Sequence, residues 1–379
     1  MTKFLHTSDW QMGLKAVHAG VKSKELRMKR FEAASRIADI AKERNVDFVI
    51  LAGDTFEHHD VDEVIVKKTV EVLNRFAPIS VYILPGNHDP WVPGGIWGRR
   101  SWERVGSHVT LCTAMKEIQI GYEVVLYPCP LMQKKSGLDP TSWIPNRAEG
   151  EKRIRIGIAH GSLDIIPNPD MANFPISKNR PEQSGLDYLA LGDWHSFFQH
   201  GRAVYSGTPE PTNFNEPDSG DVVILEIREA GENPRLNRYQ TRSLTWAEFS
   251  PTIQDLTDVE ALENAIKQLG PVSSLALRIN PKLEAVIDDV TIQALSTLGK
   301  ELEQETFFLD WNIDSPAPAS QKLAAHMPEG ILQRIDEALS AILTGEIPEG
   351  PGRAYAGTDP VVVQTAQALL HRLALGGNE

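Results

Sequence analysis

The chain has 379 residues, and its 41% apolar content is enough to bury the cores of two or three domains. It contains two cysteines, Cys112 and Cys129, and no apolar run as long as a membrane span, which argues against a disulfide framework and against a membrane protein. The net charge of −13, taken over the whole chain, argues against nucleic-acid binding. The charge is unevenly distributed, however, because residues 246–379 hold 20 acidic and 8 basic residues, whereas residues 1–245 hold 31 acidic and 30 basic residues.

We therefore expect the acidic C-terminal third to bind a partner protein rather than the phosphates of a nucleic acid. The alternative is that its charges form a well-solvated surface that favours solubility. The first ten residues, MTKFLHTSDW, lead straight into a strand pattern and leave no room for a signal peptide. We expect a cytoplasmic protein.

Strand and helix patterns alternate through roughly the first ninety residues. Apolar residues at helical spacing predict helices over Ser23–Arg44 and Val64–Phe76. Short runs rich in Val, Ile and Leu predict buried strands at Val46–Ala52, Val81–Pro85, Ile154–Ala159 and Tyr188–Leu191. This order predicts an α/β core.

Further short strands are predicted up to about residue 245, at Val109–Leu111, Val124–Tyr127, Ala203–Ser206, Val222–Ile227 and Leu236–Thr241. Residues 246–316 have the pattern of a small α+β accessory domain, with helices and strands alternating at Val259–Leu269, Ser274–Ile279, Val290–Leu302 and Thr306–Ile313. Residues 317–379 are predicted to form a helical tail. It follows a Pro-Ala stretch at Pro316–Ala319 and contains a helix at Gln321–Leu343, a linker at Gly345–Gly357 and a helix at Val361–Leu375.

Five polar clusters each stand at the end of an apolar run: His6–Gln11, Gly53-Asp54, Gly86–Asp89, Ala159–Gly161 and Gly192–His195. If the runs are neighbouring strands of a sheet, the polar residues at their ends lie close together along one edge. Their oxygen and imidazole groups can then bind the same metal ions. A mixed set of Asp, Asn and His favours a pair of transition-metal ions over calcium. Two such ions hold a hydroxide in line with a phosphate, so the sequence predicts phosphoester hydrolysis.

In this order the five clusters resemble the motifs of the calcineurin-like metallophosphoesterases. The opening Leu5–Gly13 is similar to the start of the SbcD-type DNA repair nucleases within that superfamily, and Ser206–Pro209 extends the likeness. The resemblance covers about residues 1–215. It implies a four-layer α-β-β-α metallophosphoesterase sandwich, to which the α+β accessory domain, as a cap of the site, and the helical tail are added.

The resemblance also implies roles for individual residues. The first metal would be held by Asp9, Gln11, Asp54 and His195, and the second by Asp54, Asn87, His160 and Asp193. His88 matches the catalytic histidine that protonates the leaving oxygen or steadies the charged phosphate. Asp89 would orient His88, and His6 would position Asp9 from behind the metal ligands.

Two positions depart from the family pattern. Gln11 and Asp193 stand where histidine ligands are expected, so each metal exchanges an imidazole for a harder oxygen ligand. We expect two divalent ions, Mn²⁺ foremost, with Mg²⁺ or Fe²⁺ as alternatives and zinc disfavoured. The opposing interpretation is that the two substitutions mark a catalytically weakened protein.

The segment Trp91–Arg104 interleaves aromatic and basic residues close to the Gly86–Asp89 motif. Trp97 and Trp102 are expected to stack on bases, and Arg99 and Arg100 to bind backbone phosphates. The alternative is a rigid loop whose tryptophans pack on the domain.

Apolar stripes mark both predicted tail helices, at Ile331, Leu332, Ile335, Leu339 and Ile342 in one and at Val362, Val363, Ala366, Leu369, Leu370 and Leu373 in the other. Core packing is one explanation. The resemblance implies another, in which such helices bind the coiled coil of an SbcC-type ATPase and two subunits pair through helices of the first domain. The sequence thus predicts a metal-dependent DNA nuclease, exonuclease or endonuclease, of a repair complex. The alternatives are a phosphodiesterase for small substrates and a DNA-clamping or regulatory subunit of an SMC-like ATPase.

Overall fold

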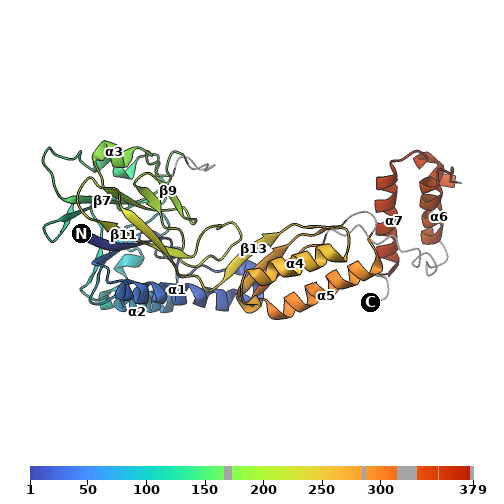
Figure 1. The fold of residues 1–379 in the computed structure, drawn as a ribbon, viewed down its shortest axis with the longest axis horizontal. Helices are drawn as coiled ribbons and strands as arrows, with labels where there is room; N and C mark the ends of the chain where they lie inside the picture. The colour runs from blue at the N-terminus through green and yellow to red at the C-terminus, as the bar shows by residue number, and fades with distance from the viewer. Residues whose placement is uncertain (166–172, 284–286, 314–330, 349, 376–379) are drawn as a thin grey trace. The chain divides into compact units, whose positions relative to one another are not determined.

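The structure, a computed structural model, describes residues 1–165, 173–283, 287–313, 331–348 and 350–375 (Figure 1). Contacts divide the chain into two units, Met1–Trp246 and Ala247–Glu379, and the division falls one residue after the predicted end of the first domain. The predicted boundary between residues 316 and 317, the Pro316–Ala319 stretch and the first ten residues of the predicted helix Gln321–Leu343 lie outside the described residues.

Two six-stranded sheets form the first unit. Their strand orders are β12-β11-β1-β2-β3-β4 and β5-β6-β7-β8-β10-β9. The first sheet contains β1 (Thr2–Thr7), β2 (Phe48–Ala52), β3 (Ser80–Leu84), β4 (Val109–Leu111), β11 (Asp221–Ile227) and β12 (Arg235–Gln240). The second contains β5 (Ile118–Ile120), β6 (Val124–Pro128), β7 (Ile154–His160), β8 (Tyr188–Gly192), β9 (Phe198–His200) and β10 (Ala203–Tyr205).

The central strands of each sheet are parallel. Strands β1 to β4 pair in parallel, and so do β6, β7, β8 and β10, whereas the outer strands β5, β9, β11 and β12 pair antiparallel to their neighbours. The carboxyl ends of parallel strands lie at one edge of a sheet. The loops that follow β1, β2, β3, β7 and β8 are therefore brought together, and these are the loops that carry the five polar clusters.

Alternate residues of each strand face different layers. Phe4 and Phe48 stack at 5.1 Å between ring centroids and belong to the core shared by the two sheets. Leu5 and Val49, one residue further along each strand, instead pack against the helices α1 (Ser23–Glu43) and α2 (Glu63–Asn74). This alternation is the two-residue period of a strand buried on both faces.

The outer face of the second sheet carries its own core under loops and short helical turns. The only α-helix among the described residues of this layer is the five-residue α3 (Arg180–Ser184), preceded by a 3-10 turn at Pro140–Trp143. Figure 1 shows α1 and α2 on one side of the first unit and α3 on the opposite side. The expected α-β-β-α order is confirmed, with a thin fourth layer.

Element boundaries differ from the predictions where the chain turns. The predicted strand Val46–Ala52 begins at Phe48 because Asn45 adopts a left-handed φ of 52° and the Val46 N–H bonds to the Ala41 carbonyl at 3.1 Å, which closes the end of α1. An αL residue after a helix commonly terminates it in this way. Val46 thus completes the helix cap rather than pairing in the sheet.

The second unit begins with a small α+β region. A three-stranded sheet, β13-β15-β17, and a two-stranded pair, β14 and β16, accompany two helices. Their bounds are β13 (Thr245–Phe249), β14 (Thr252–Ile253), α4 (Leu256–Gln268), β15 (Leu275–Ile279), β16 (Lys282–Leu283), α5 (Asp289–Glu305) and β17 (Phe308–Trp311). Helix α4 starts three residues before the predicted Val259 because Asp255 and Asp258 form a capping box at its first turn.

Two helices, α6 (Ile331–Leu343) and α7 (Pro360–Leu375), pack against each other near the C-terminus. The Gln367 amide donates hydrogen bonds to Asp336 and Ser340, both at 2.8 Å. The predicted linker between them contains a 3-10 turn at Gly350–Tyr355.

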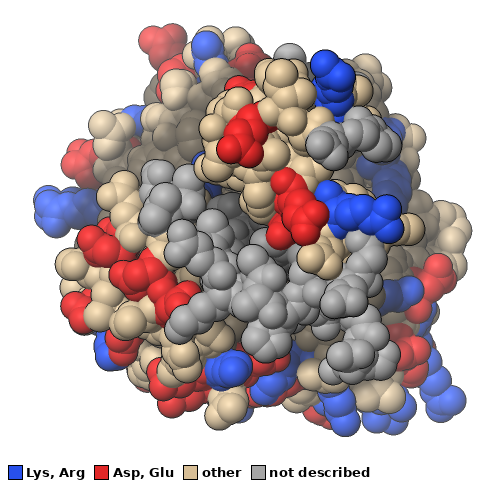
Figure 2. All heavy atoms as spheres, turned by 90° about the vertical axis from the view of Figure 1, so that its right-hand side faces the viewer, with Lys and Arg blue, Asp and Glu red and all other residues tan. Residues whose placement is uncertain are grey.

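Figure 2 shows both acidic and basic side chains on the face that it draws. None of the helices in the described ranges combines the length and apolarity needed to cross a bilayer.

Candidate metal centre

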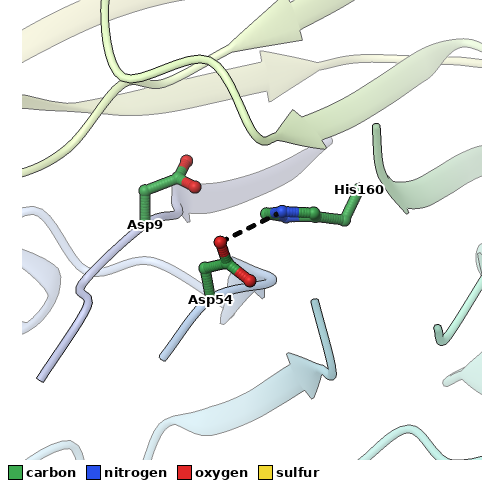
Figure 3. A group of neighbouring side chains, drawn as sticks. All are labelled: Asp9, Asp54 and His160. Carbon is green, nitrogen blue, oxygen red and sulfur yellow. Dashed lines mark ion pairs between the residues drawn. The ribbon is translucent and has the colours of Figure 1, made fainter. Parts of the chain in front are cut away.

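Three predicted ligands from distant parts of the chain meet at the carboxyl edge of the strands. Asp9 follows β1, Asp54 follows β2, and His160 is the last residue of β7. All three are at most 2% exposed, and one ligand atom from each lies within 4.8 Å of the others. Figure 3 shows the two carboxylates and the imidazole pointing toward one another. This is the separation expected of groups that share metal ions.

A first set of donors surrounds the Nε2 atom of His160. It lies 3.2 Å from Asn87 Oδ1, 3.4 Å from Asp54 Oδ2 and 3.8 Å from Asp193 Oδ1. Oxygen ligands bound to one ion at about 2.1 Å stand about 3 Å apart in octahedral geometry, so a small closure suffices to hold a cation. The Nδ1–H of His160 donates to the Ala52 carbonyl at 3.0 Å, which leaves Nε2 free as a ligand.

A second set of predicted donors contains Asp9, Gln11 and His195, and one carboxylate oxygen of Asp9 lies within 4.8 Å of one of Asp54. The Asp9 carboxylate accepts hydrogen bonds from the Ser8 hydroxyl at 2.6 Å and from the Asp193 N–H at 3.1 Å. The Gln11 amide and His195 Nε2 are 3.0 Å apart. Since an amide can rotate to exchange its nitrogen and oxygen, Gln11 can turn either atom toward the site.

Four of the predicted ligands occupy a backbone conformation that residues with side chains rarely adopt. Asp9, Gln11, Asp54 and Asp193 have φ values of 53°, 43°, 50° and 101°. Such conformations cost of the order of 1 kcal/mol or more each and persist where the surroundings require them. The strain is therefore concentrated in residues that the sequence predicts as metal ligands.

Motif glycines make room for these ligands. A Cβ atom on Gly53 would stand 2.1 Å from His160 Nδ1, and one on Gly86 would stand 2.1 Å from Asp54 Oδ1. Glycine is thus required at both positions by close packing against the ligands, not only by the turn.

His88 lies at the same edge, but Asp89 does not hold its ring. The Asp89 carboxylate accepts hydrogen bonds from the Gly86 and Phe56 N–H groups at 2.7 and 2.9 Å. The Nδ1–H of His88 instead donates to the Glu57 carbonyl at 2.8 Å, with the Glu57 carboxylate 3.8 Å away. The expectation that Asp89 orients His88 is corrected: Asp89 secures the loop backbone, and Glu57 orients the imidazole.

His6 also differs from its expected role. Its side chain is fully buried between the sheets, and Nδ1 is 2.9 Å from the Tyr188 hydroxyl rather than in contact with Asp9. Burial lowers the pKa of His6 to about 3, so the ring is neutral. Asp9 is positioned instead by Ser8, which also contacts Ser206 at 3.0 Å.

Burial and neighbouring charges shift the pKa values of the ionisable groups in the centre. Burial raises the pKa of Asp9, and burial also raises the pKa of Asp193 to about 6. For Asp54, burial is outweighed by His160 and by the His88 N–H, which together lower its pKa. Burial would lower the pKa of His160, but the charges of Asp54, Asp9 and Asp193 raise it well above its usual value. The centre therefore attracts positive charge.

The predicted nucleic-acid segment is mostly packed onto the first unit. Trp97 and Trp102 are 3% and 9% exposed, lie 4.8 Å apart and both contact Phe56 edge-on. Arg99 donates hydrogen bonds to the Val61 and His59 carbonyls. The expectation that these tryptophans stack on bases is wrong, because their faces are covered.

Of the four predicted DNA-binding residues, Arg100 alone keeps an exposed side chain among the described residues.

A cleft of about 810 Å³ opens over the centre. Its walls include Gln11, His88, Asp193 and His195 from the predicted site. They also include residues outside the prediction, namely Lys15, His18, Glu57, His58, Trp194, Asn213, Asn215 and Glu216. A volume of this size accommodates a small phosphodiester or part of a polynucleotide strand.

Three residues that contact the predicted site were not anticipated. Glu57 orients His88, and Glu216 accepts a hydrogen bond from His195 Nδ1 at 2.7 Å. Arg30, 2% exposed on α1, donates to the Trp10 carbonyl at 2.7 Å. Glu57 lies three residues after Asp54 and could have been considered for that reason. Neither Arg30 nor Glu216 belongs to a recognisable motif.

The Glu216 contact affects both partners. Burial would lower the pKa of His195, but the hydrogen bond to Glu216 and the charge of Asp9 raise it. Conversely, burial would raise the pKa of Glu216, and His195 together with Arg30 lowers it.

Comparison with known proteins agrees with this geometry. The profile of the calcineurin-like phosphoesterase family matches residues 2–225. An uncharacterized metallophosphoesterase, YhaO of Bacillus subtilis strain 168, is 23% identical over 83% of this chain and 81% of its own length. The DNA double-strand break repair proteins Mre11 of Methanosarcina mazei and Methanosarcina acetivorans are 23% and 21% identical over 62% of this chain. The aligned part spans 37% and 38% of those two proteins.

Proposed function

This chain belongs to the calcineurin-like phosphoesterase family, and from that premise we propose that it is a DNA nuclease that hydrolyses phosphodiester bonds at a centre of two divalent ions. The observation that carries the proposal is the buried meeting of Asp9, Asp54 and His160 within 4.8 Å of one another, and we assign Asp54 to two donor sets. The proposed ligands are Asp9, Gln11 and His195 on one side and Asp193, Asn87 and His160 on the other, so that each side supplies one carboxylate, one amide and one imidazole.

The buried charge supports occupancy by metal. In the described part of the chain, no Lys or Arg side chain forms an ion pair with Asp9, Asp54 or Asp193. Buried carboxylates without a compensating cation are costly, and divalent ions would offset that cost. Each proposed set contains more oxygen than nitrogen donors, which favours Mn²⁺ or Mg²⁺ over zinc and leaves Fe²⁺ as an alternative.

The remaining chemistry falls to this chain's own side chains. When bound, two ions would supply a nucleophilic hydroxide and neutralise the phosphate charge. His88 borders the cleft, and its Nδ1–H is held by the Glu57 carbonyl. A proton for the leaving oxygen would therefore come from Nε2 of the ring protonated on both nitrogens, which would leave the neutral ring with its Nδ1–H in place. The strained backbone of the acidic ligands holds them in place before substrate arrives.

DNA as the substrate is supported by the two Mre11 relatives, which are named for DNA double-strand break repair. The cleft alone does not distinguish DNA from a small diester, and small-substrate hydrolysis is the alternative. The buried positions of Trp97 and Trp102 remove one source of support for DNA. Among the cleft residues, the exposed Lys15 and Trp194 are better placed to contact a nucleotide.

For the second unit we propose docking of an SbcC-type ATPase on the α6–α7 hairpin. Ile331, Ile335 and Val362 of the two apolar stripes are 73%, 42% and 56% exposed, and a groove of about 1230 Å³ runs along the hairpin. Deletion of residues 320–379 should abolish co-purification with the ATPase while leaving hydrolysis of a small diester intact. Retained co-purification would remove the proposal.

The test of the main proposal is a nuclease assay in Mn²⁺ with end-labelled linear DNA, circular DNA and a chromogenic diester. We expect the parent to cleave DNA and both Asp54→Ala and His88→Ala to lose cleavage. Hydrolysis of the chromogenic diester alone would favour the small-substrate function, and DNA binding without turnover would favour a clamping subunit.

A further inference from the structure

The two imidazoles of the metal centre have different partners on their outer nitrogens. His160 donates its Nδ1–H to a neutral group, the Ala52 carbonyl, at 3.0 Å. His195 donates its Nδ1–H to a charged group, the Glu216 carboxylate, at 2.7 Å. A carboxylate partner fixes the ring tautomer and makes the opposite nitrogen a stronger metal ligand than a carbonyl partner does.

Glu216 is itself held in place from its other oxygen. Its side chain is 9% exposed, and Oε2 accepts a hydrogen bond from the Thr212 N–H at 2.7 Å. The Thr212 hydroxyl in turn accepts a bond from the Arg30 guanidinium at 3.0 Å. The carboxylate therefore has one position in which it satisfies both His195 and Thr212.

Arg30 connects this support to the segment that carries Asp9. Its second guanidinium nitrogen donates to the Trp10 carbonyl at 2.7 Å and lies 3.4 Å from the Asp9 carbonyl. The Thr208 hydroxyl donates to the same Asp9 carbonyl at 2.9 Å. A single buried cation thus joins the backbone of one ligand to the loop that orients another.

We propose that Glu216 is a positioning residue for the ion assigned to Asp9, Gln11, Asp54 and His195, and that it compensates for the missing imidazole at position 11. The inference rests on the proposed function. Gln11 offers that ion a weak neutral ligand, so His195 is its only nitrogen donor. Increasing the basicity of His195 is then the means by which this half of the centre keeps its affinity.

The substitution Glu216→Gln distinguishes this role from packing. The amide must present its NH₂ group either to His195 Nδ1 or to the Thr212 N–H. If the NH₂ group faces His195, Nδ1 must accept a hydrogen bond, so the ring carries its proton on Nε2, the nitrogen that should bind the ion. If the NH₂ group faces Thr212 instead, it meets the Thr212 N–H, and two donors face each other. Loss of such an outer partner weakens metal binding about 10–100-fold.

The experiment is calorimetric Mn²⁺ titration of the full chain. Asn87→Ala, which removes a ligand of the other ion alone, identifies the binding step that belongs to that ion. We expect Glu216→Gln to weaken the remaining step by about 10–100-fold and to leave the Asn87-dependent step unchanged. Asp218→Asn is the matched control, because it removes a carboxylate two residues away that pairs with Arg238 on the surface.

A second measurement does not depend on any variant folding. In the metal-free parent, the ¹⁵N spectrum of His195 at a pH where the ring is neutral should show a protonated Nδ1 and a bare Nε2. A proton on Nε2, equal weakening of both steps in Glu216→Gln, or no weakening at all would overturn the inference. If any of these three results appears but the parent still binds two Mn²⁺ and cleaves DNA, the proposed function stands and only the role of Glu216 is overturned. A parent that binds no metal removes both.

Discussion

Replacing Asp54 with Asn should remove most of the stabilisation that Mn²⁺ gives to the first unit. Asp54 is 2% exposed and is the one residue assigned to both donor sets. Asn keeps the shape and can still accept the His88 N–H bond that Oδ1 receives at 2.9 Å. It withdraws the shared negative charge, however, and turns an NH₂ group toward the ions.

The size of the effect follows from linkage. At a free Mn²⁺ concentration 100 times its dissociation constant, one bound ion stabilises the folded state by about 2.7 kcal/mol. In a unit of the size of Met1–Trp246, each kcal/mol moves Tm by about 2–4 °C, so each ion raises Tm by about 5–11 °C. If Asn weakens binding 100-fold, the same concentration gives about 0.4 kcal/mol, or less than about 2 °C.

Thermal unfolding of parent and Asp54→Asn, each with and without Mn²⁺, provides the assay. The metal-free melting temperatures separate any effect on folding from the effect on metal binding, and Asp218→Asn again serves as the surface control. A variant that keeps the full Mn²⁺ shift of the parent would refute the shared-ligand reasoning.

Three further outcomes are expected. Gly86→Ala places a Cβ 2.1 Å from Asp54 Oδ1, so Mn²⁺ titration should show weakened binding of both ions; unchanged binding would mean that the loop can move aside. Burial raises the pKa of Glu210 from 4.5 to about 7, so the folded protein binds this proton more tightly than the unfolded chain does. The protonated side chain therefore stabilises the fold by about 3 kcal/mol below pH 4.5, and this contribution is lost as the pH rises through 7. Chemical unfolding at pH 4.5 and 7.5 should show this difference in the parent but not in Glu210→Gln, and identical pH profiles would contradict it. Arg100→Ala should lower by about one the slope of the logarithm of the DNA-binding constant against the logarithm of salt concentration. Arg99→Ala should mainly lower Tm, because Arg99 is bonded to backbone carbonyls. Equal slopes for Arg100→Ala and the parent would remove Arg100 from the interface.

The sequence was most informative where covalent order dictates position. His160 ends a strand, and Asp9 and Asp54 each follow one by two residues. The parallel order of the strands places these side chains at one edge whatever the details of packing. The glycines beside them are detectable for the same reason, since only a residue without a Cβ fits at Gly53 and Gly86. This is why the α/β fold and the core of the site could be predicted.

Side-chain partners were less predictable, because they depend on loop closure in three dimensions. His195 is 21 residues from Glu216, and no spacing rule connects them. The pattern of Trp97 and Trp102 among basic residues is the same whether the rings face solvent or pack on Phe56, and only the structure shows that they are covered.

Asp89 illustrates the same limit. An acidic residue next to a catalytic histidine suggests a direct contact, but adjacent residues commonly point in different directions, and here the carboxylate turns back to two backbone N–H groups. The contact to His88 comes from Glu57, which lies on the loop after another strand.

The central claim, that two ions share Asp54, is tested most directly by anomalous scattering from a crystal of the full chain grown with Mn²⁺. We expect two manganese peaks, one beside Asn87, His160 and Asp193 and the other beside Asp9, Gln11 and His195, with Asp54 between them. A map with no peak next to Asp54, or with a single peak at saturating Mn²⁺, would contradict it.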